Sequence, residues 1–363
     1  MEKMVKDSSF WKNKKVLVTG HTGFKGSWLC LTLQKLGAEV QGFSLEPPTP
    51  INLYQEASVG DDMLDLRCDI KDRLAVQDVF KQCKPEFVFH LAAQPLVRYS
   101  YINPVETYET NFMGTLNILE AIRYTNSVST VVIITTDKCY ENKERLEGYK
   151  ENEAMGGYDP YSSSKGAAEL LISSYRNSYF NSSANNERKI GLASARAGNV
   201  IGGGDWAKDR LIPDIIDSIV KKKKVLIRNP DAIRPWQHVL EPVFGYLRLA
   251  ECLSLDPSEY SEGWNFGPNK DDAKSVKWIV EKLLDIWGLE NGWELDKNLS
   301  PHEAHYLKLD CSKSAERLKC FPLLSLEESL EMVSAWHENF ILGADMKEYC
   351  FQEIQTFMEK VNF

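Results

Sequence analysis

Acid, base and hydroxyl side chains occur in two short stretches at spacings that suit catalysis. In "YSSSK", Tyr161 and Lys165 are four residues apart, so on a helix the ammonium would lie beside the phenol. A phenol titrates near 10, and its use as a base near pH 7 needs about 4 kcal/mol of stabilisation of the phenolate, to which a neighbouring cation contributes. Thr136, Asp137 and Lys138 directly follow the apolar run "VVIIT". These groups indicate a site that transfers protons.

Three glycines follow the apolar stretch "KVLV" in the segment "TGHTGFKG". Gly20, Gly23 and Gly26 stand where an expected strand passes into an expected helix. Glycines there let the chain turn sharply, let its backbone approach a pyrophosphate and let the helix pack close to the strand. The segment, which also contains Phe24 and Lys25, therefore predicts a dinucleotide-binding loop.

Apolar stretches alternate with helical patterns along the first 200 residues. We expect strands at 15–20, 39–45, 63–70, 86–93, 130–137 and 189–202, and helices at 25–37, 72–83, 104–125 and 161–180. Helices of this length between strands imply right-handed crossovers and an α/β fold with a Rossmann-type, doubly wound parallel sheet. Ligands bind beyond the carboxyl ends of such strands, where Asp137 and Lys138 fall.

The alternating pattern loosens after "GNVIGGGDW". We therefore expect a dinucleotide-binding domain at residues 1–200. Residues 201–363 should form a smaller, mixed lobe that binds the substrate, with some chain crossing back to the sheet. The lysines at 221–224 follow a helical pattern and are expected in its last turn, where they complement the helix dipole.

Composition excludes several classes of function. With 43 basic and 52 acidic residues the net charge is −9, which disfavours nucleic acids and anionic membranes as partners. The sequence has neither an apolar signal core at its start nor the ~18 apolar residues needed to cross a membrane. Its eight cysteines form no CxxC pair, which favours a reducing cytoplasm, and its six histidines show no metal-ligand spacing.

The glycine loop, followed about 140 residues later by YxxxK, resembles the extended short-chain dehydrogenase/reductase superfamily. The resemblance implies a nicotinamide dinucleotide bound along the carboxyl edge of the sheet. Asn111, in "NFMGTLNILEA", matches an active-site asparagine of the superfamily. Positions that match its cofactor contacts are Asp69 and Ile70 beside the adenine, and Leu91, Ala92 and Ala93 along the ribose.

The stretch "TTDKCYEN" resembles the nucleotide-sugar 4,6-dehydratases, and with "TGHTGFKGSWL" it resembles those that act on CDP-glucose. The resemblance implies that Thr136 hydrogen-bonds the reacting hydroxyl and that Tyr161 is the base at C4. Asp137 matches the acid that protonates the departing C6 hydroxyl. Lys138 stands where dTDP-glucose enzymes carry a glutamate base, so it either removes the C5 proton or stabilises the enolate.

The nature of the cofactor depends on the end of the second strand. Ser44 lies there, where NAD-preferring members usually carry an acid for the ribose hydroxyls, and Glu46 comes slightly later. Lys25 in the glycine loop would tolerate a 2′-phosphate. We expect NAD, because a dehydratase regenerates its cofactor in every cycle, and NADP is not excluded.

Substrate contacts and assembly are also implied by the resemblance. Asn199, Arg210 and Arg234 would hold the diphosphate of CDP-glucose, Gln94 and Arg98 would line the sugar pocket, and His238 would touch the substrate. The superfamily pairs through the helix after Asn111 and the YxxxK helix, which predicts a homodimer.

Three other functions remain open from the sequence. A nucleotide-sugar 4-epimerase would not need Asp137 or Lys138, and a dehydratase could act on another nucleotide-glucose. A non-catalytic NAD-binding regulator would tolerate the loss of the Tyr161 hydroxyl. Replacement of Asp137 by Asn separates the first alternative from a dehydratase.

Overall fold

The computed structural model describes residues 9–180, 189–269, 272–289, 292–296 and 306–361. Residues 1–8, which begin the stretch expected to lack a signal core, lie outside this range.

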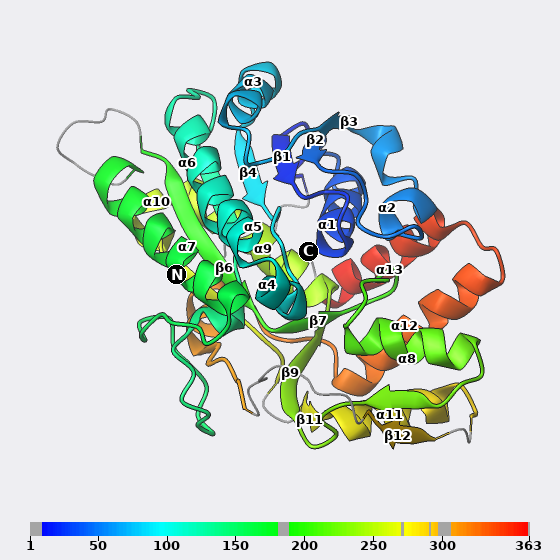
Figure 1. The fold of residues 1–363 in the computed structure, drawn as a ribbon. Coiled ribbons are helices and arrows are strands. Elements are labelled where there is room, and N and C mark those ends of the chain that lie inside the picture. Colours follow the sequence, from blue (N-terminus) through cyan, green and yellow to red (C-terminus); the bar gives the residue numbers. More distant parts are fainter. Residues whose placement is uncertain (1–8, 181–188, 270–271, 290–291, 297–305, 362–363) are drawn as a thin grey trace.

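Seven parallel strands form the large sheet, in the order β10-β6-β5-β4-β1-β2-β3 (Figure 1). The order reverses between β1 and β4, and the predicted Rossmann-type sheet is confirmed. The last strand, β10, comes from the C-terminal half and pairs with β6. The bounds are β1 Lys15–Thr19, β2 Glu39–Ser44, β3 Leu64–Arg67, β4 Phe87–His90, β5 Thr130–Ile134, β6 Gly191–Ala197 and β10 Gly263–Phe266.

Helices cover both faces of this sheet. On one face lie α1 (Phe24–Lys35), α9 (Leu240–Leu255) and α13 (Met346–Val361), and on the other α3 (Arg73–Cys83), α6 (Thr115–Arg123) and α7 (Pro160–Tyr175) (Figure 1). Side chains alternate along β5, so Val132 and Ile134 pack with the first layer and Val131 and Ile133 with the second. Burial on both faces explains why these strands read as continuous apolar runs.

Three expected elements differ in detail. The helix expected at 104–125 consists of α5 (Pro104–Tyr108), a π-helical segment (Glu109–Gly114) and α6. The strand expected at 130–137 ends at Ile134, because a 3₁₀ turn, Asp137–Cys139, follows and is capped by the Thr136 hydroxyl, which accepts a hydrogen bond from the Lys138 N–H. The basic run begins only after α8 (Leu211–Val220) ends, and its first lysine, Lys221, pairs with Asp217.

The strand expected at 189–202 is split between two sheets. Beyond β6 the chain passes through Gly198 into β7 (Asn199–Ile201), which pairs with β9 (Ile233–His238). A Cβ on Gly198 would lie 2.8 Å from Pro235 Cγ, so a side chain would not fit at this crossing. β9 also pairs with β11 (Ala273–Ser275), while β8 (Val225–Ile227) pairs with β12 (Trp293–Leu295).

The small sheets share a core with α8, α11 (Val276–Ile286) and α12 (Leu326–Ile341). The chain then returns through α13 to α1, and Figure 1 shows these helices side by side. The described residues also include six short helical segments, namely α2 (Leu53–Glu56), a 3₁₀ turn at Val59–Asp62, α4 (Val97–Ile102), α10 (Pro257–Tyr260) and π-helical segments at Arg176–Phe180 and Ser314–Leu318. Within the described ranges, no helix has the length and apolar character that a membrane span requires.

Candidate active site

The glycine loop forms a cradle that admits no side chains. Gly20 has a φ of +73°, and a Cβ there would lie 2.6 Å from the Ala92 backbone nitrogen. A Cβ on Gly26 would lie 2.2 Å from the Gly20 carbonyl oxygen. Because α1 begins right after Gly23, its free N–H groups face the carboxyl edge of the sheet. This geometry fits a dinucleotide pyrophosphate.

Loops from β3 and β4 lie at the same edge of the sheet. Ile70 packs against Gly114, and the Asn117 amide donates to the Ile70 carbonyl at 2.9 Å, which fixes the loop of Asp69 and Ile70. Leu91, Ala92 and Ala93 are partly exposed. The Ala92 N–H donates to the Thr19 hydroxyl at 3.1 Å, so the end of β4 is fastened to β1.

The end of β2 meets the glycine loop. The Ser44 hydroxyl lies 2.8 Å from the Thr22 hydroxyl, and Glu46 beyond it pairs with Arg67 at 3.1 Å. The Lys25 ammonium, whose contact with a 2′-phosphate stays a prediction, lies 5.9 Å from the centre of the Tyr246 ring. Burial, followed by the charges of Arg210 and Lys165, lowers the pKa of Lys25 to about 7, so its amine lies among the catalytic charges.

Asp137 is the most buried member of the group that the sequence predicts to be catalytic. It is 2% exposed, its Oδ1 accepts from the Thr136 hydroxyl at 3.0 Å, and its Oδ2 has no hydrogen-bond partner among the described residues. Burial raises the pKa of Asp137 above its ordinary value, although the charges of Lys138 and Arg234 oppose this. A buried carboxyl with a raised pKa holds its proton to a higher pH than an exposed one, which suits a general acid.

Tyr161 and Lys165 project from the first turns of α7. Asp159 caps this helix by accepting from the Ser162 N–H at 2.9 Å, and Pro160 occupies its first position. Burial raises the pKa of Tyr161 to about 12, while a hydrogen bond with Thr136 acts to lower it. Burial also lowers the pKa of Lys165 to about 8. The phenol of Tyr161 is therefore protonated at neutral pH in the protein alone, and an added positive charge nearby would favour the phenolate.

Several matches with known proteins bear on this arrangement. The family model described as GDP-mannose 4,6 dehydratase matches residues 17–333. A CDP-glucose 4,6-dehydratase of Salmonella typhimurium is 52% identical over 352 residues, which cover 97% of this chain and 98% of that protein. The chain belongs to the nucleotide-sugar 4,6-dehydratases.

Solved structures share the fold of this dehydratase at lower identity. UDP-glucose 4-epimerase of Thermotoga maritima superposes with a TM-score of 0.78 at 22% identity, covering 90% of this chain and 99% of its own. The dTDP-glucose 4,6-dehydratase of Bacillus anthracis, solved in complex with NAD, gives 0.74 at 20% identity, covering 90% and 97%. These likenesses show that the chain shares the fold of nucleotide-sugar epimerases and dehydratases.

Two arginines from the C-terminal half of the chain act electrostatically on Asp137 and Tyr161. The charge of Arg234 acts on Asp137, and that of Arg210 acts on Tyr161. Arg210 also pairs with the buried Asp205 at 2.8 Å. Asn199 lies on β7 opposite Trp236 and is partly exposed.

Gln94, Arg98 and Asn111 have defined partners. The Gln94 amide donates to Thr107 at 2.9 Å, and Arg98 pairs with Asp209 of the smaller lobe at 2.7 Å. The Asn111 amide donates to the Gln94 carbonyl at 3.1 Å and to the Ser164 hydroxyl at 2.9 Å. Asn111 thus ties the end of β4 to α7.

His238, expected from the sequence to touch the substrate, has no exposed surface in the structure. It is fully buried, with its ring edge to face with Trp28 of α1, and burial lowers its pKa to about 3. The neutral ring accepts the Leu240 N–H at 3.4 Å. Its place at the end of β9, inside the layer of α1, accounts for this burial.

A buried ion pair beneath Lys165 is a feature that the sequence patterns did not predict. Glu169 and Arg196 pair at 2.8 Å, and Glu169 also accepts from the Thr135 and Ser194 hydroxyls. Although burial opposes it, Arg196 holds the pKa of Glu169 below its ordinary value. The available signal was helical spacing, because Glu169 is one turn after Lys165 and shares its face.

The Glu169 charge is expected to set the alkaline limit of activity. It raises the pKa of Lys165, so Glu169→Gln should lower that pKa further, and the lysine should lose its charge at a lower pH. We expect the alkaline limb of the kcat profile to move down by roughly 1 pH unit. Steady-state kinetics across pH measures this shift, and Glu169→Asp, which keeps the charge, is the matched control. An unchanged limb in a folded Gln variant would contradict the assignment.

Proposed function

We propose that this dehydratase converts CDP-glucose to CDP-4-keto-6-deoxyglucose and water. The observation that carries the proposal is Asp137, a buried carboxyl with a free Oδ2 and a raised pKa, next to the Tyr161 phenol and the Lys138 amine. An acid at this place is needed to expel a hydroxyl group and is superfluous for epimerisation. The choice of CDP-glucose is supported by the relative at 52% identity, whose name states that substrate.

The residues present fit NAD. Gly20 and Gly26 lack Cβ atoms, which lets the end of β4 and the start of α1 pack against the glycine loop, and the N-terminus of α1 favours the negative charge of a pyrophosphate. Asp69 and Ile70 would hold the adenine, Leu91, Ala92 and Ala93 would follow the ribose, and Ser44 and Phe24 would complete the site. When bound, NAD would accept a hydride from C4 and later return it to C6.

Oxidation at C4 requires removal of the O4 proton. Tyr161 takes this proton, Thr136 orients the hydroxyl, and the Lys165 ammonium stabilises the phenolate. Burial costs the phenolate free energy in the protein alone. Base catalysis by Tyr161 is therefore confined to the occupied site.

Elimination then uses the 4-keto group, which acidifies the C5 proton. Lys138 removes that proton or stabilises the resulting enolate, while Asp137 protonates the C6 hydroxyl so that it departs as water. Arg210, Arg234 and Asn199 would hold the diphosphate, and Gln94 and Arg98 the glucose ring. The departing C6 hydroxyl takes its proton from Asp137, and the proton removed from C5 returns to C5 when the C5–C6 double bond is reduced at C6. The O4 proton taken by Tyr161 passes through solvent to restore Asp137.

Incubation of the purified protein with CDP-glucose tests the proposal. We expect NMR to show a 4-keto-6-deoxy sugar, with UDP-glucose, dTDP-glucose and GDP-mannose converted more slowly. Absence of product with CDP-glucose, with or without added NAD or NADP, would sink it. If only another nucleotide sugar gives a product, the proposed reaction would stand and the assigned substrate would change.

We also propose a homodimer formed through the helices near the catalytic group. Large apolar side chains on this face are exposed, among them Val105 of α5 at 69%, Met113 of the π-helical segment at 45% and Leu170 of α7 at 64%. Such side chains gathered on neighbouring helices favour contact with a second copy. Light scattering should give twice the chain mass for the wild type and the single mass for Met113→Glu/Leu170→Glu. A wild-type monomer would refute the dimer.

A cytoplasmic location is part of the same proposal. All eight cysteines are free thiols in the structure, and six of them are buried. Free thiols persist in reducing compartments, and the nucleotide sugar is a small metabolite of such a compartment in this scheme. Cell fractionation with activity measurement checks the location.

A further inference from the structure

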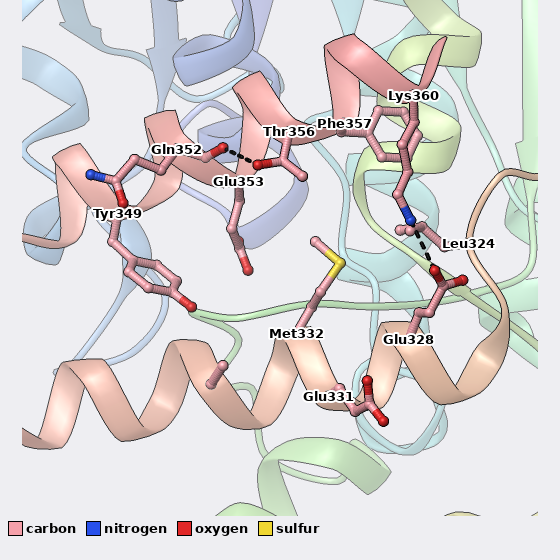
Figure 2. A pocket seen from close by; sticks show the side chains of 11 residues that line it. Leu324, Glu328, Glu331, Met332, Tyr349, Gln352, Glu353, Thr356, Phe357 and Lys360 are labelled. Carbon is pink, nitrogen blue, oxygen red and sulfur yellow. Dashed lines mark hydrogen bonds and ion pairs between the residues drawn. The ribbon is translucent and has the colours of Figure 1, made fainter.

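A groove lies between α12 and α13, the two C-terminal helices (Figure 2). Its volume is about 450 Å³, within the range of small-molecule sites. α12 belongs to the core of the smaller lobe, whereas α13 packs on α1 and, through Phe357, on Phe244 of α9. None of the described residues that line it belongs to the proposed active site.

A buried carboxyl group points into this groove. Glu353 extends from α13 toward α12, between Tyr349 and Met332 (Figure 2). It is 9% exposed, and its Oε2 has no hydrogen-bond partner among the described residues. Burial of an unpaired polar group costs free energy, and native proteins rarely leave one unsatisfied. The groove therefore holds a strong acceptor that lacks a donor.

The charges around Glu353 favour a cation. Lys360 is the one basic residue in the described lining, and it already pairs with Glu328 at 2.8 Å (dashed in Figure 2). Glu331 lines the groove from α12 and is exposed. Besides the Glu328–Lys360 pair, one acidic residue from each helix lines the groove, Glu353 from α13 and Glu331 from α12.

Apolar side chains form the walls between these acids. Met332 projects from α12, and Phe357 and Leu324 lie beside it. A ligand that fits must therefore have an aliphatic stem with positive charge at its ends. An ammonium group offers three donors and forms short, strong hydrogen bonds with carboxylates.

We propose that this groove binds a free aliphatic diamine, with one ammonium on Glu353, the other on Glu331, and the methylene chain on Met332 and Phe357. The site is independent of the proposed reaction, because binding can be measured without turnover. Burial raises the pKa of Glu353 to about 8, so full ionisation needs a more alkaline solution.

Isothermal titration calorimetry of the full chain with 1,4-diaminobutane and 1,5-diaminopentane tests the site at pH 9. There Glu353 is ionised, and an alkylammonium, which titrates near 10.4 as lysine does, keeps its charge. We expect one site per chain and a Kd roughly tenfold lower for the better diamine than for butylamine. The neutral 1,4-butanediol should not bind.

Three variants locate the binding. Glu353→Gln should raise the Kd of the diamine by about tenfold or more. Glu331→Gln should lower the affinity for the diamine to that for butylamine. Glu359→Gln removes the same charge from an exposed position of α13 outside the groove and should change nothing. Equal affinity in Glu353→Gln, equal binding of butanediol, or no binding of any amine would overturn the proposal. If a second copy fills the groove instead, no amine will bind and Glu353→Lys will lower the molar mass in light scattering.

Discussion

Asp137→Asn is expected to stop water elimination while C4 oxidation continues. The amide fills the same buried space but cannot give a proton to the departing C6 hydroxyl, so dehydration should fall by roughly 10²–10⁴-fold. NMR of the product measures this loss. In D₂O the C5 proton of the substrate should still exchange, because Tyr161, Lys165 and Lys138 are intact.

The fold of this variant should not suffer. Burial raises the pKa of Asp137, so the native state disfavours its carboxylate. A carboxyl with a raised native pKa loses stability as the pH rises above its unfolded value near 3.9. Asn carries no such penalty, and thermal unfolding at pH 8 should show a midpoint no lower than that of the wild type. Dehydration at the wild-type rate would refute the role of Asp137 as acid. Loss of both dehydration and C5 exchange would refute it as well.

Tyr161→Phe is expected to block the reaction one step earlier. Without the phenol oxygen nothing takes the O4 proton, so we expect a loss of roughly 10²–10⁴-fold in kcat. The C5 proton should then not exchange in D₂O, because no ketone forms to acidify it. This difference from Asp137→Asn separates the two steps by one NMR measurement.

The matched control is Tyr158→Phe, which removes a phenol oxygen three residues earlier at a side chain that is 80% exposed. It should keep wild-type activity and exchange. Full activity in Tyr161→Phe would refute Tyr161 as the base at C4, and C5 exchange without Tyr161 would assign that base to another group.

The local patterns that predicted the fold have a physical basis. A parallel strand buried on both faces must be apolar throughout, which made β1, β4 and β5 visible as continuous runs. Gly20 and Gly26 were visible because backbone atoms occupy the space of their side chains. The Tyr161–Lys165 spacing needed only a helix, and α7 supplies it.

Other features depend on contacts between distant segments. The π-helical segment brings Gly114 against Ile70, and the break at Gly198 follows from its closeness to Pro235. The spacing of apolar residues within one segment does not reveal either contact. The sequence therefore suggested an uninterrupted helix and one long strand.

The sequence alone determined the parallel sheet, the glycine loop and the order of the acid and base residues, because these follow from the periodicity of side chains and from the steric freedom of glycine. Only the tertiary structure decided the charge states. It buried Asp137 and Glu353, placed the Lys25 amine near Lys165, and buried His238 against Trp28. The reason is that desolvation and Coulomb interactions depend on which distant segments surround a group, and a sequence pattern does not contain those neighbours.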